Sequence, residues 1–197
     1  MKNSDYVVQM REPEYNRDCL TRKLFDVNMR LFHADQKNNW YKNHILAIIE
    51  QMEWILKSEF EDYSSNPKGG KYGISGANLG IPYNIIAFWA DGEAYNVKGL
   101  GKFIFPMINP CIITKSAEMH KTMSNCGSIK YKEKIPVLRH KNITVSWYDE
   151  KGEKQQDVFS IKKGGATIQH EVDHSNGILI FDRYLEQGGD PEILKEI

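Results

Sequence analysis

The sequence predicts a single α+β domain in which small antiparallel or mixed sheets pack around one central helix. Two observations point to the sheets: a continuous apolar stretch at residues 83–90 and an alternating hairpin pattern at residues 142–161. A third points to the helix, which carries His170 and His174. Because the helical and extended stretches do not alternate along the chain, we favour α+β over an alternating α/β arrangement.

The first half of the chain is dominated by a helical pattern, and we expect helix over residues 17–60. Apolar side chains recur there at helical spacing, so one face is expected to pack into the core rather than bind a partner. This stripe consists of Ile45, Ile48, Ile49, Met52 and Leu56. A loop is expected at residues 64–70, which are rich in Ser, Asn, Pro and Gly.

Three further stretches are expected to be extended. Residues 83–90 predict a buried strand, which a turn at residues 91–92 ends. Pro106 interrupts the apolar residues 103–108, so we expect an edge strand or a broken strand there. Residues 142–148 alternate in polarity, turn at 149–152, and are expected to pair with residues 156–161 as a hairpin.

Composition narrows the class of protein. The 197 residues suffice for one domain, and 26 basic residues balance 26 acidic ones, so no charge excess favours nucleic acid. No apolar run predicts a membrane span, and residues 1–18 lack a signal-peptide core. Three cysteines favour a reducing, intracellular setting. Cys19 and Cys111 are expected to be ordinary small hydrophobic residues.

The helix expected at residues 166–174 carries the pattern H-E-x-x-H. It contains no helix breaker, and Gly177 follows as a stop signal. His170 and His174 are four residues apart and share a helix face, so both imidazoles can bind one metal ion. Glu171, beside the first ligand, can accept a proton from a water at that ion. The alternative is a helix whose two His merely cap it or pair with carboxylates.

The residues around this pattern decide where a third ligand lies. Ile180 stands where one class of metalloprotease has its third His, and only a short tail with Glu186, Glu192 and Glu196 follows. The third ligand is therefore expected upstream, where a Cys, His or acid would serve. Cys126 is a candidate because it lies in a small, polar, turn-like segment, but the chemistry alone leaves the choice open.

Three segments together resemble the peptide deformylase family. The third family motif is complete, as Gln169-His170-Glu171-Val172-Asp173-His174. The second is reduced to Ser124-Asn125-Cys126-Gly127-Ser128, and the first to residues 71–82 with Gly73 and Gly80-Ile81-Pro82. The resemblance covers about residues 45–185 of a single domain spanning 1–197. Residues 1–44 are expected to be a divergent N-terminal extension of it.

The resemblance implies a metal-dependent hydrolase that removes the formyl group from N-formylmethionyl peptides and releases formate. It implies one divalent metal ion held by Cys126, His170 and His174. Iron(II) is then the expected metal in cells, with zinc, nickel and cobalt also able to bind. Glu171 becomes the general base, while the N–H of Gly127 and the amide of Asn78 stabilise the oxyanion.

The two reduced motifs change groups around this centre. Asn78 replaces a family glutamine and has a side chain one methylene shorter. Ser124 replaces a family glutamate, and Gly127 replaces a leucine. That glutamate normally pairs with an arginine, whose counterpart here is Arg139. Three roles stay open for Arg139: binding another acid, binding a substrate carbonyl, or pointing into solvent.

The implied substrate is an N-formylated peptide or nascent chain that adds as a strand along the Gly73 segment. Its methionine pocket is expected near Tyr72, Gly127, Ala166 and His170, with Arg139 as a further substrate contact. The resemblance implies a monomer in the bacterial cytoplasm or an organellar matrix, binding neither nucleic acid nor membrane. Two alternatives remain: a paralogue with altered or lost activity that binds peptide N-termini, and a small metallopeptidase.

Overall fold

The computed structural model describes residues 20–34, 39–65, 73–92, 102–129 and 133–196, with only the backbone described for residues 59–65 and 194–196. Tyr72 and Cys19, two of the residues singled out above, lie outside the described residues.

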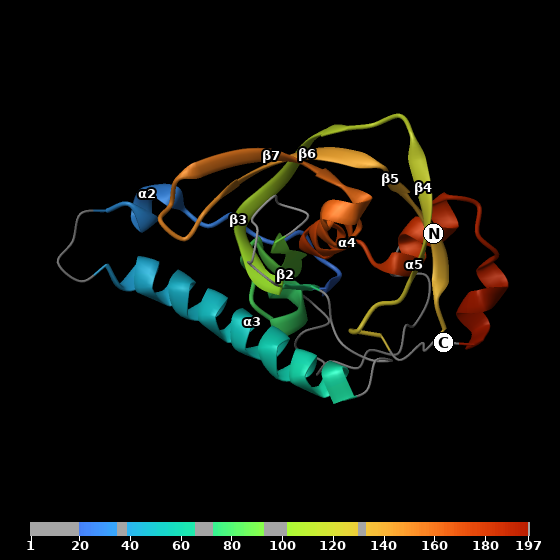
Figure 1. The fold of residues 1–197 in the computed structure, drawn as a ribbon, viewed down its shortest axis with the longest axis horizontal. Helices are drawn as coiled ribbons and strands as arrows, with labels where there is room; N and C mark the ends of the chain where they lie inside the picture. The colour runs from blue at the N-terminus through green and yellow to red at the C-terminus, as the bar shows by residue number, and fades with distance from the viewer. Residues whose placement is uncertain (1–19, 35–38, 66–72, 93–101, 130–132, 197) are drawn as a thin grey trace.

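Two antiparallel sheets and several helices make up the described part of the chain (Figure 1). The larger sheet has the strand order β1-β2-β3-β6-β7, and the smaller sheet pairs β4 with β5. The strands are β1 (Gly73–Ser75), β2 (Ile85–Asp91), β3 (Lys102–Lys115), β4 (Met119–Ser124), β5 (Ile135–His140), β6 (Asn142–Tyr148) and β7 (Lys154–Ser160). All strand pairs are antiparallel, as expected for an α+β domain.

The helices cover the larger sheet on both faces. They are α2 (Met29–Phe32), α3 (Trp40–Ser65), α4 (Gly165–Ser175) and α5 (Ile180–Glu186), with short 3₁₀ turns η2 (Gly76–Leu79), η4 (Ile161–Lys163) and η5 (Pro191–Glu196). In Figure 1, α3 crosses below the sheet while α4 lies at the centre, enclosed by both sheets. The prediction of sheets around one central helix is confirmed.

The sequence of β2 is continuously apolar because both faces of this strand are covered by helices. Ile85 and Ala87 pack in the cluster formed with α3, whereas Ile86 and Phe88 pack in the cluster formed with α4. Successive side chains of a strand point to opposite faces, and here both faces are covered by a helix. The expected stripe on α3 is also confirmed, because all five of its residues are buried.

The prediction of helix over residues 17–60 is wrong for the segment before α2. Residues 22–28 lie outside any helix, with isolated bridges Lys23↔Asn176 and Phe25↔Tyr83. The N–H groups of Leu24 and Phe25 donate to the carbonyls of Ser175 and Pro82 instead of to their own turn. Tertiary hydrogen bonds therefore override the local helical pattern.

Of the two alternatives expected at Pro106, the broken strand is not observed, whereas the edge position is found locally. β3 is continuous and lies in the middle of the larger sheet. Pro106 pairs with Ala87 of β2, whereas the pairing with β6 begins only at Ile108↔Tyr148. Because Pro106 has no pairing partner in β6, its missing N–H breaks no hydrogen bond to that strand. This part of β3 is locally an edge.

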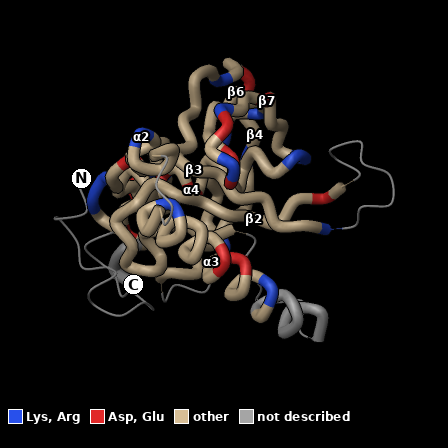
Figure 2. The backbone as a smooth tube through the Cα atoms, turned by 90° about the vertical axis from the view of Figure 1, so that its left-hand side faces the viewer, with Lys and Arg blue, Asp and Glu red and all other residues tan. Residues whose placement is uncertain are grey.

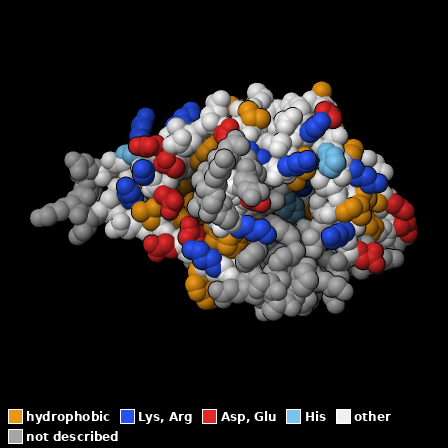
Figure 3. Space-filling model, in the orientation of Figure 1, with side chains coloured by type: hydrophobic (Ala, Val, Ile, Leu, Met, Phe, Trp, Pro, Cys, Tyr) orange, Lys and Arg blue, Asp and Glu red, His pale blue; other side chains and the backbone are white. Residues whose placement is uncertain are grey.

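The hairpin is confirmed, with β6 and β7 in register from Asn142↔Ser160 to Tyr148↔Lys154. Cys111 is exposed, so the expectation that it packs as a small hydrophobic residue is wrong. Basic and acidic residues are mixed along the backbone in Figure 2, and their side chains are interspersed over the face seen in Figure 3, in keeping with the balanced charge. None of the helices in the described ranges is long and apolar enough to cross a membrane.

Candidate metal centre

Glycines at both ends set the bounds of α4. Gly164 precedes the helix with φ 80°, a left-handed conformation that favours glycine, and a Cβ there would lie 2.9 Å from the ring of Phe88. At the other end Gly177 has φ 71°, and its N–H donates to the carbonyl of His174. The helix therefore starts against the larger sheet and stops directly after its last metal-binding candidate, as the sequence predicts.

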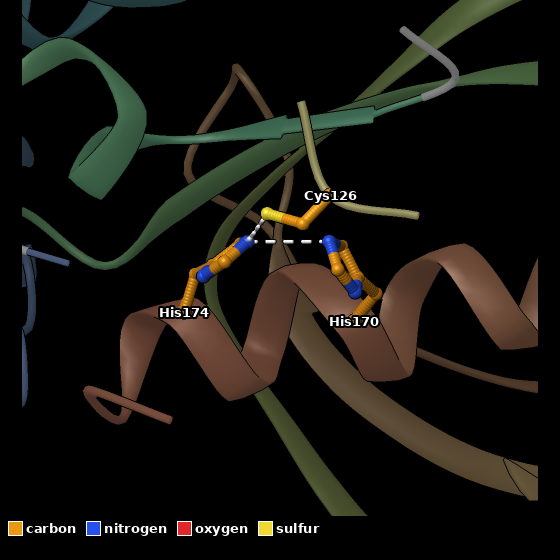
Figure 4. A group of neighbouring side chains, drawn as sticks. All are labelled: Cys126, His170 and His174. Atoms are coloured by element: carbon orange, nitrogen blue, oxygen red, sulfur yellow. Dashed lines mark hydrogen bonds between the residues drawn. The ribbon is translucent and has the colours of Figure 1, made fainter. Parts of the chain in front are cut away.

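Three side chains from two distant segments meet above α4 (Figure 4). Cys126 Sγ lies 3.3 Å from Nε2 of His174, although the two residues are 48 positions apart. Nε2 of His174 lies 3.2 Å from Nε2 of His170. The ligand atoms of all three residues lie within 4.8 Å of one another. This convergence differs from two helix histidines that merely cap or pair with carboxylates.

The environment keeps both imidazoles in the form that binds metals. Burial, opposed by Asp173 and assisted by Arg139, lowers the pKa of His174 to about 4. Burial also lowers the pKa of His170 well below its usual value, as do His174 and Arg139. Neutral imidazoles and a thiolate are suitable ligands for a divalent transition metal. Since Cys126 is only 3 % exposed and His174 only 1 %, the donor set fits such an ion.

Glu171 lies against the face of strand β1 at Gly73. Its side chain is 4 % exposed, and a Cβ at Gly73 would lie 2.9 Å from its Oε1 and 2.6 Å from Cγ2 of Thr167. A glycine is therefore needed at position 73 for β1 to approach α4 this closely. Among the described strands, β1 pairs only with β2, so its other side is an open edge.

The amide of Asn78 joins the turn after β1 to the segment that carries Cys126. Its Oδ1 accepts hydrogen bonds from the N–H of Ser75 at 2.7 Å and from Oγ of Ser75 at 2.8 Å. Its Nδ2 donates to Oγ of Ser128 at 2.5 Å. Two donors facing Oδ1 settle which end of the amide is oxygen. Gly127, between Cys126 and Ser128, is partly exposed in this turn.

Arg139 pairs with an acid on α4, and the alternative of a solvated arginine is wrong. Its side chain is 4 % exposed, and Nη1 donates to Oδ2 of Asp173. Arg183 of α5 donates to the other oxygen of Asp173, from Nη2 at 2.7 Å and from Nε at 3.1 Å. Ser124 contributes no carboxylate to this group, and its Oγ lies 3.1 Å from Oγ1 of Thr122.

Other residues around the centre were missed or only partly anticipated. Gln169 donates to and accepts from the backbone of His140, which ties α4 to β5. Ser75 and Arg183 received no role from the sequence, although the Ser75–Asn78 spacing is that of a capping box. Ala166 lies partly exposed in the first turn of α4. Ile180 is buried in the core, consistent with its not being a ligand.

Comparison with known proteins decides the family. A family model described as polypeptide deformylase matches residues 15–188. The chain belongs to this family. A peptide deformylase from Streptococcus pneumoniae is 29 % identical over 163 residues, which cover 75 % of this chain and 74 % of the relative. The match begins at residue 15, upstream of the boundary near residue 45 that the motifs suggested.

Solved structures of deformylases share the fold. A probable peptide deformylase from Synechococcus phage S-SSM7 superposes with a TM-score of 0.64 at 22 % identity, covering 90 % of this chain and 99 % of the other. A class I type b peptide deformylase from Acinetobacter baumannii, solved with Met-Ala-Ser bound, gives 0.59 at 21 % identity, covering 90 % and 97 %. A deformylase from Plasmodium falciparum gives 0.59 at 20 % identity, covering 96 % and 94 %.

Proposed function

We propose that this deformylase family member removes the formyl group from N-formylmethionyl peptides and releases formate. The observation that carries the proposal is the convergence of Cys126, His170 and His174 beside the buried carboxylate of Glu171. The full H-E-x-x-H pattern and its third ligand candidate thus occur together in a chain of this family. Retention of all four groups favours an active enzyme over a paralogue that only binds peptides.

The metal is proposed to be one divalent ion per chain, held by Cys126, His170 and His174. Iron(II) is the expected ion in cells, and zinc, nickel and cobalt suit the same donors. When bound, such an ion supplies Lewis-acid polarisation of the formyl carbonyl and lowers the pKa of a water. The neutral state of both imidazoles supports this assignment, since no proton has to leave them.

Glu171 is proposed to move the proton. Its position next to His170 in the sequence and its burial against β1 support this role. It accepts a proton from the attacking water and then delivers that proton to the departing amine. Exclusion of bulk solvent around this carboxylate would protect the proton from exchange during transfer.

The oxyanion is proposed to be stabilised by the N–H of Gly127 and the amide of Asn78. Gly127 directly follows Cys126, and Asn78, in the turn after β1, is tied to that segment by its hydrogen bond to Ser128. Three hydrogen bonds fix the amide of Asn78. A fixed donor is worth more than a mobile one because it needs no reorganisation in the transition state.

The peptide is proposed to add to β1 as a further strand. Gly73 lets β1 lie close to Glu171, and β1 pairs only with β2 among the described strands, so its other edge is open to an added strand. The methionine pocket is placed near Gly127, Ala166 and His170, with Tyr72 preceding β1 in the sequence. Arg139 is buried against Asp173, which supports an indirect role for it over direct substrate contact. The Acinetobacter baumannii relative with bound Met-Ala-Ser supports a peptide ligand.

The setting of the reaction is proposed to be the bacterial cytoplasm or an organellar matrix, on nascent chains. The chain is expected to act as a monomer. Balanced charge supports the expectation that it does not bind nucleic acid or membrane directly.

The test is formate release from formyl-Met-Ala-Ser by iron-loaded protein prepared anaerobically. Formate production that depends on the bound metal supports the proposal. Tight peptide binding without formate would favour a paralogue that has lost catalysis. Cleavage of unformylated Met-Ala-Ser would instead favour a metallopeptidase. Parallel assays with zinc, nickel and cobalt rank the metals by turnover per bound ion.

A further inference from the structure

A groove lies where β3 and β6 separate. Their pairing begins at Ile108↔Tyr148, and β6 ends at Tyr148. Residues 102–107, at the start of β3, therefore pair only with β2 among the described strands. The β6–β7 hairpin instead packs on the segment of α2, since a Cβ at Gly152 would lie 2.5 Å from Cε1 of His33 (Figure 1). The edge of β3 that β6 leaves is thus unpaired in the described part of the chain.

The lining of the groove shows that it runs along this strand edge. Its volume is about 350 Å³, within the roughly 300–1,000 Å³ typical of ligand sites. One wall is formed by residues 103–106, all partly exposed. Successive side chains of a strand point to opposite faces of a sheet, so a groove lined by consecutive residues lies at the edge. The opposite wall comes from the hairpin and consists of Trp147, Asp149, Glu150 and Gln155.

The hairpin wall is held in place by its own turn. Oδ1 of Asp149 accepts hydrogen bonds from the N–H groups of Lys151 at 3.0 Å and Glu153 at 2.8 Å. Its Oδ2 accepts one from Nε2 of Gln155 at 2.9 Å. Glu150 is exposed and forms no ion pair with any described residue. The carboxylate of Glu150 is therefore available to a ligand in the groove.

The groove is acidic. Among the described residues that line it, Asp149 and Glu150 carry negative charge and none carries positive charge. Partial burial raises the pKa of Glu150, and the charges of Glu53, Asp149 and Glu50 raise it further. Lys57 pairs with Glu53 at 3.1 Å and offsets one of these charges. The remaining excess of carboxylates favours a basic ligand and disfavours an acidic one.

We propose that this groove binds a short, extended, basic segment of a partner protein, which adds to β3 as a strand where β6 has left. Its backbone would pair with residues 103–105, and Pro106, which has no N–H, ends the pairing. About four residues fill this length at roughly 3.3 Å per residue. Its apolar side chains would face the aromatic lining, while a Lys or Arg reaches Glu150.

This site is separate from the one proposed for the formylated peptide. That peptide is proposed to add to β1, which lies on the other side of β2 from β3. None of the residues that line the groove belongs to the Cys126–His170–His174 cluster. A ligand in the groove therefore leaves the metal centre accessible.

The test uses the capped peptide acetyl-Val-Lys-Val-Arg-Val-amide with a fluorescent label, and measures its binding to full-length, metal-loaded protein by fluorescence anisotropy. Excess unlabelled Met-Ala-Ser is present throughout, so that binding at the proposed substrate site is suppressed. Glu150→Lys reverses the charge at the rim of the groove. The matched control is Glu118→Lys, an equal reversal at an exposed carboxylate outside the groove.

Wild type and Glu118→Lys should bind the peptide with the same affinity. Glu150→Lys should bind it about tenfold more weakly, because an attraction becomes a repulsion. Absence of binding to wild type would overturn the proposal, as would equal affinity in all three proteins.

Two peptide analogues test strand addition separately from charge. Each carries N-methyl groups on alternate amides, one analogue in each of the two possible phases. A strand that adds to β3 directs only one set of its amides to that edge, so one analogue should lose binding and the other should keep it. Equal binding of both would show that charge alone attracts the peptide and would overturn the proposal.

Sedimentation of the wild type without peptide tests another occupant of the groove. The wild type should remain a monomer at the concentrations used for binding. A dimer that Glu150→Lys dissociates would mean that a second copy of the chain fills the groove, which would also overturn the proposal. None of these measurements uses formate release, so their failure is distinguishable from failure of the proposed function.

Discussion

The two halves of the candidate site are built in different ways. On the metal half, His170, Glu171 and His174 occupy adjacent positions of one helix, and only Cys126 comes from elsewhere. On the oxyanion half, Asn78 and Gly127 come from separate loops that are joined by a hydrogen bond between side chains. The helix places its groups by regular geometry, whereas the loops depend on individual contacts.

This difference explains where the sequence departs from the family pattern. The metal half keeps every residue type, because a change in any ligand cannot be corrected by a neighbour. The oxyanion half carries Asn78, Ser124 and Gly127 in place of the family residues. Around these changed positions, Asn78 bonds to Ser75 and Ser128, and Arg139 of β5 bonds to Asp173 of α4.

The largest expected effect comes from removing the metal ligand that the helix does not supply. Cys126→Ala should lose the bound metal and reduce formate release to background, because two histidines alone hold the ion weakly. Metal content per chain and turnover measure this. The matched control is Cys111→Ala, which changes an exposed free cysteine and should leave both unchanged. One metal per chain retained in Cys126→Ala would contradict the ligand assignment.

The next effect separates metal binding from proton transfer. Glu171→Gln keeps the size of the side chain but cannot accept a proton, so kcat should fall by roughly 10²–10⁴-fold at unchanged metal content. Glu118→Gln, at an exposed carboxylate paired with Lys141, should behave as wild type. A Glu171→Gln enzyme with normal kcat would show that another group acts as the base.

A smaller loss of kcat is expected from changes on the oxyanion half. There Ser128 should affect catalysis only by positioning the amide of Asn78. Asn78→Ala should lower kcat by about 10²-fold, as loss of one oxyanion donor does. Ser128→Ala should lower it less, and the double variant should be no worse than Asn78→Ala alone. Additive losses in kcat would mean that Ser128 does not position the amide.

Stability must be followed in the same cycle, because Asn78 also bonds to Ser75. Urea unfolding of each variant gives its free energy of unfolding, and a purely structural role would change that quantity without changing kcat. Ser58→Ala provides the control, since Ser58 bonds only to a carbonyl on the exposed side of α3.

The smallest expected effect concerns the ion pair between Arg183 and Asp173, the residue of α4 that precedes His174. Arg183→Gln removes the two hydrogen bonds to Oδ1 of Asp173 and should lower the free energy of unfolding by about 1 kcal/mol, since Arg183 is partly exposed. Thermal or urea unfolding measures this. Lys57→Gln breaks an exposed pair with Glu53 on α3 and should change stability by less than about 0.5 kcal/mol. Equal effects from both variants would show that the Asp173 group adds no support.

Much of the fold was accessible from local patterns. The stripe of α3, the β6–β7 hairpin and the bounds of α4 follow from periodicity and from glycines near the helix ends. The helical reading of residues 22–28 failed because backbone groups of Leu24 and Phe25 bond to distant carbonyls. At Pro106 the expected edge is correct locally, since β3 has no partner in β6 at that point, but the expected break is wrong because β3 continues through the proline.

The shared face of His170 and His174 follows from local spacing alone, because side chains four residues apart lie on one face of a helix. The balance of charge and the apolar face of α3 are likewise local properties. The contact of Cys126 with these histidines, the pairing of Arg139 with Asp173 and the hydrogen bond from Asn78 to Ser128 arise only when the chain folds. Those pairings join residues distant along the chain, and the packing of sheets against α4 selects among acceptors that local sequence cannot distinguish.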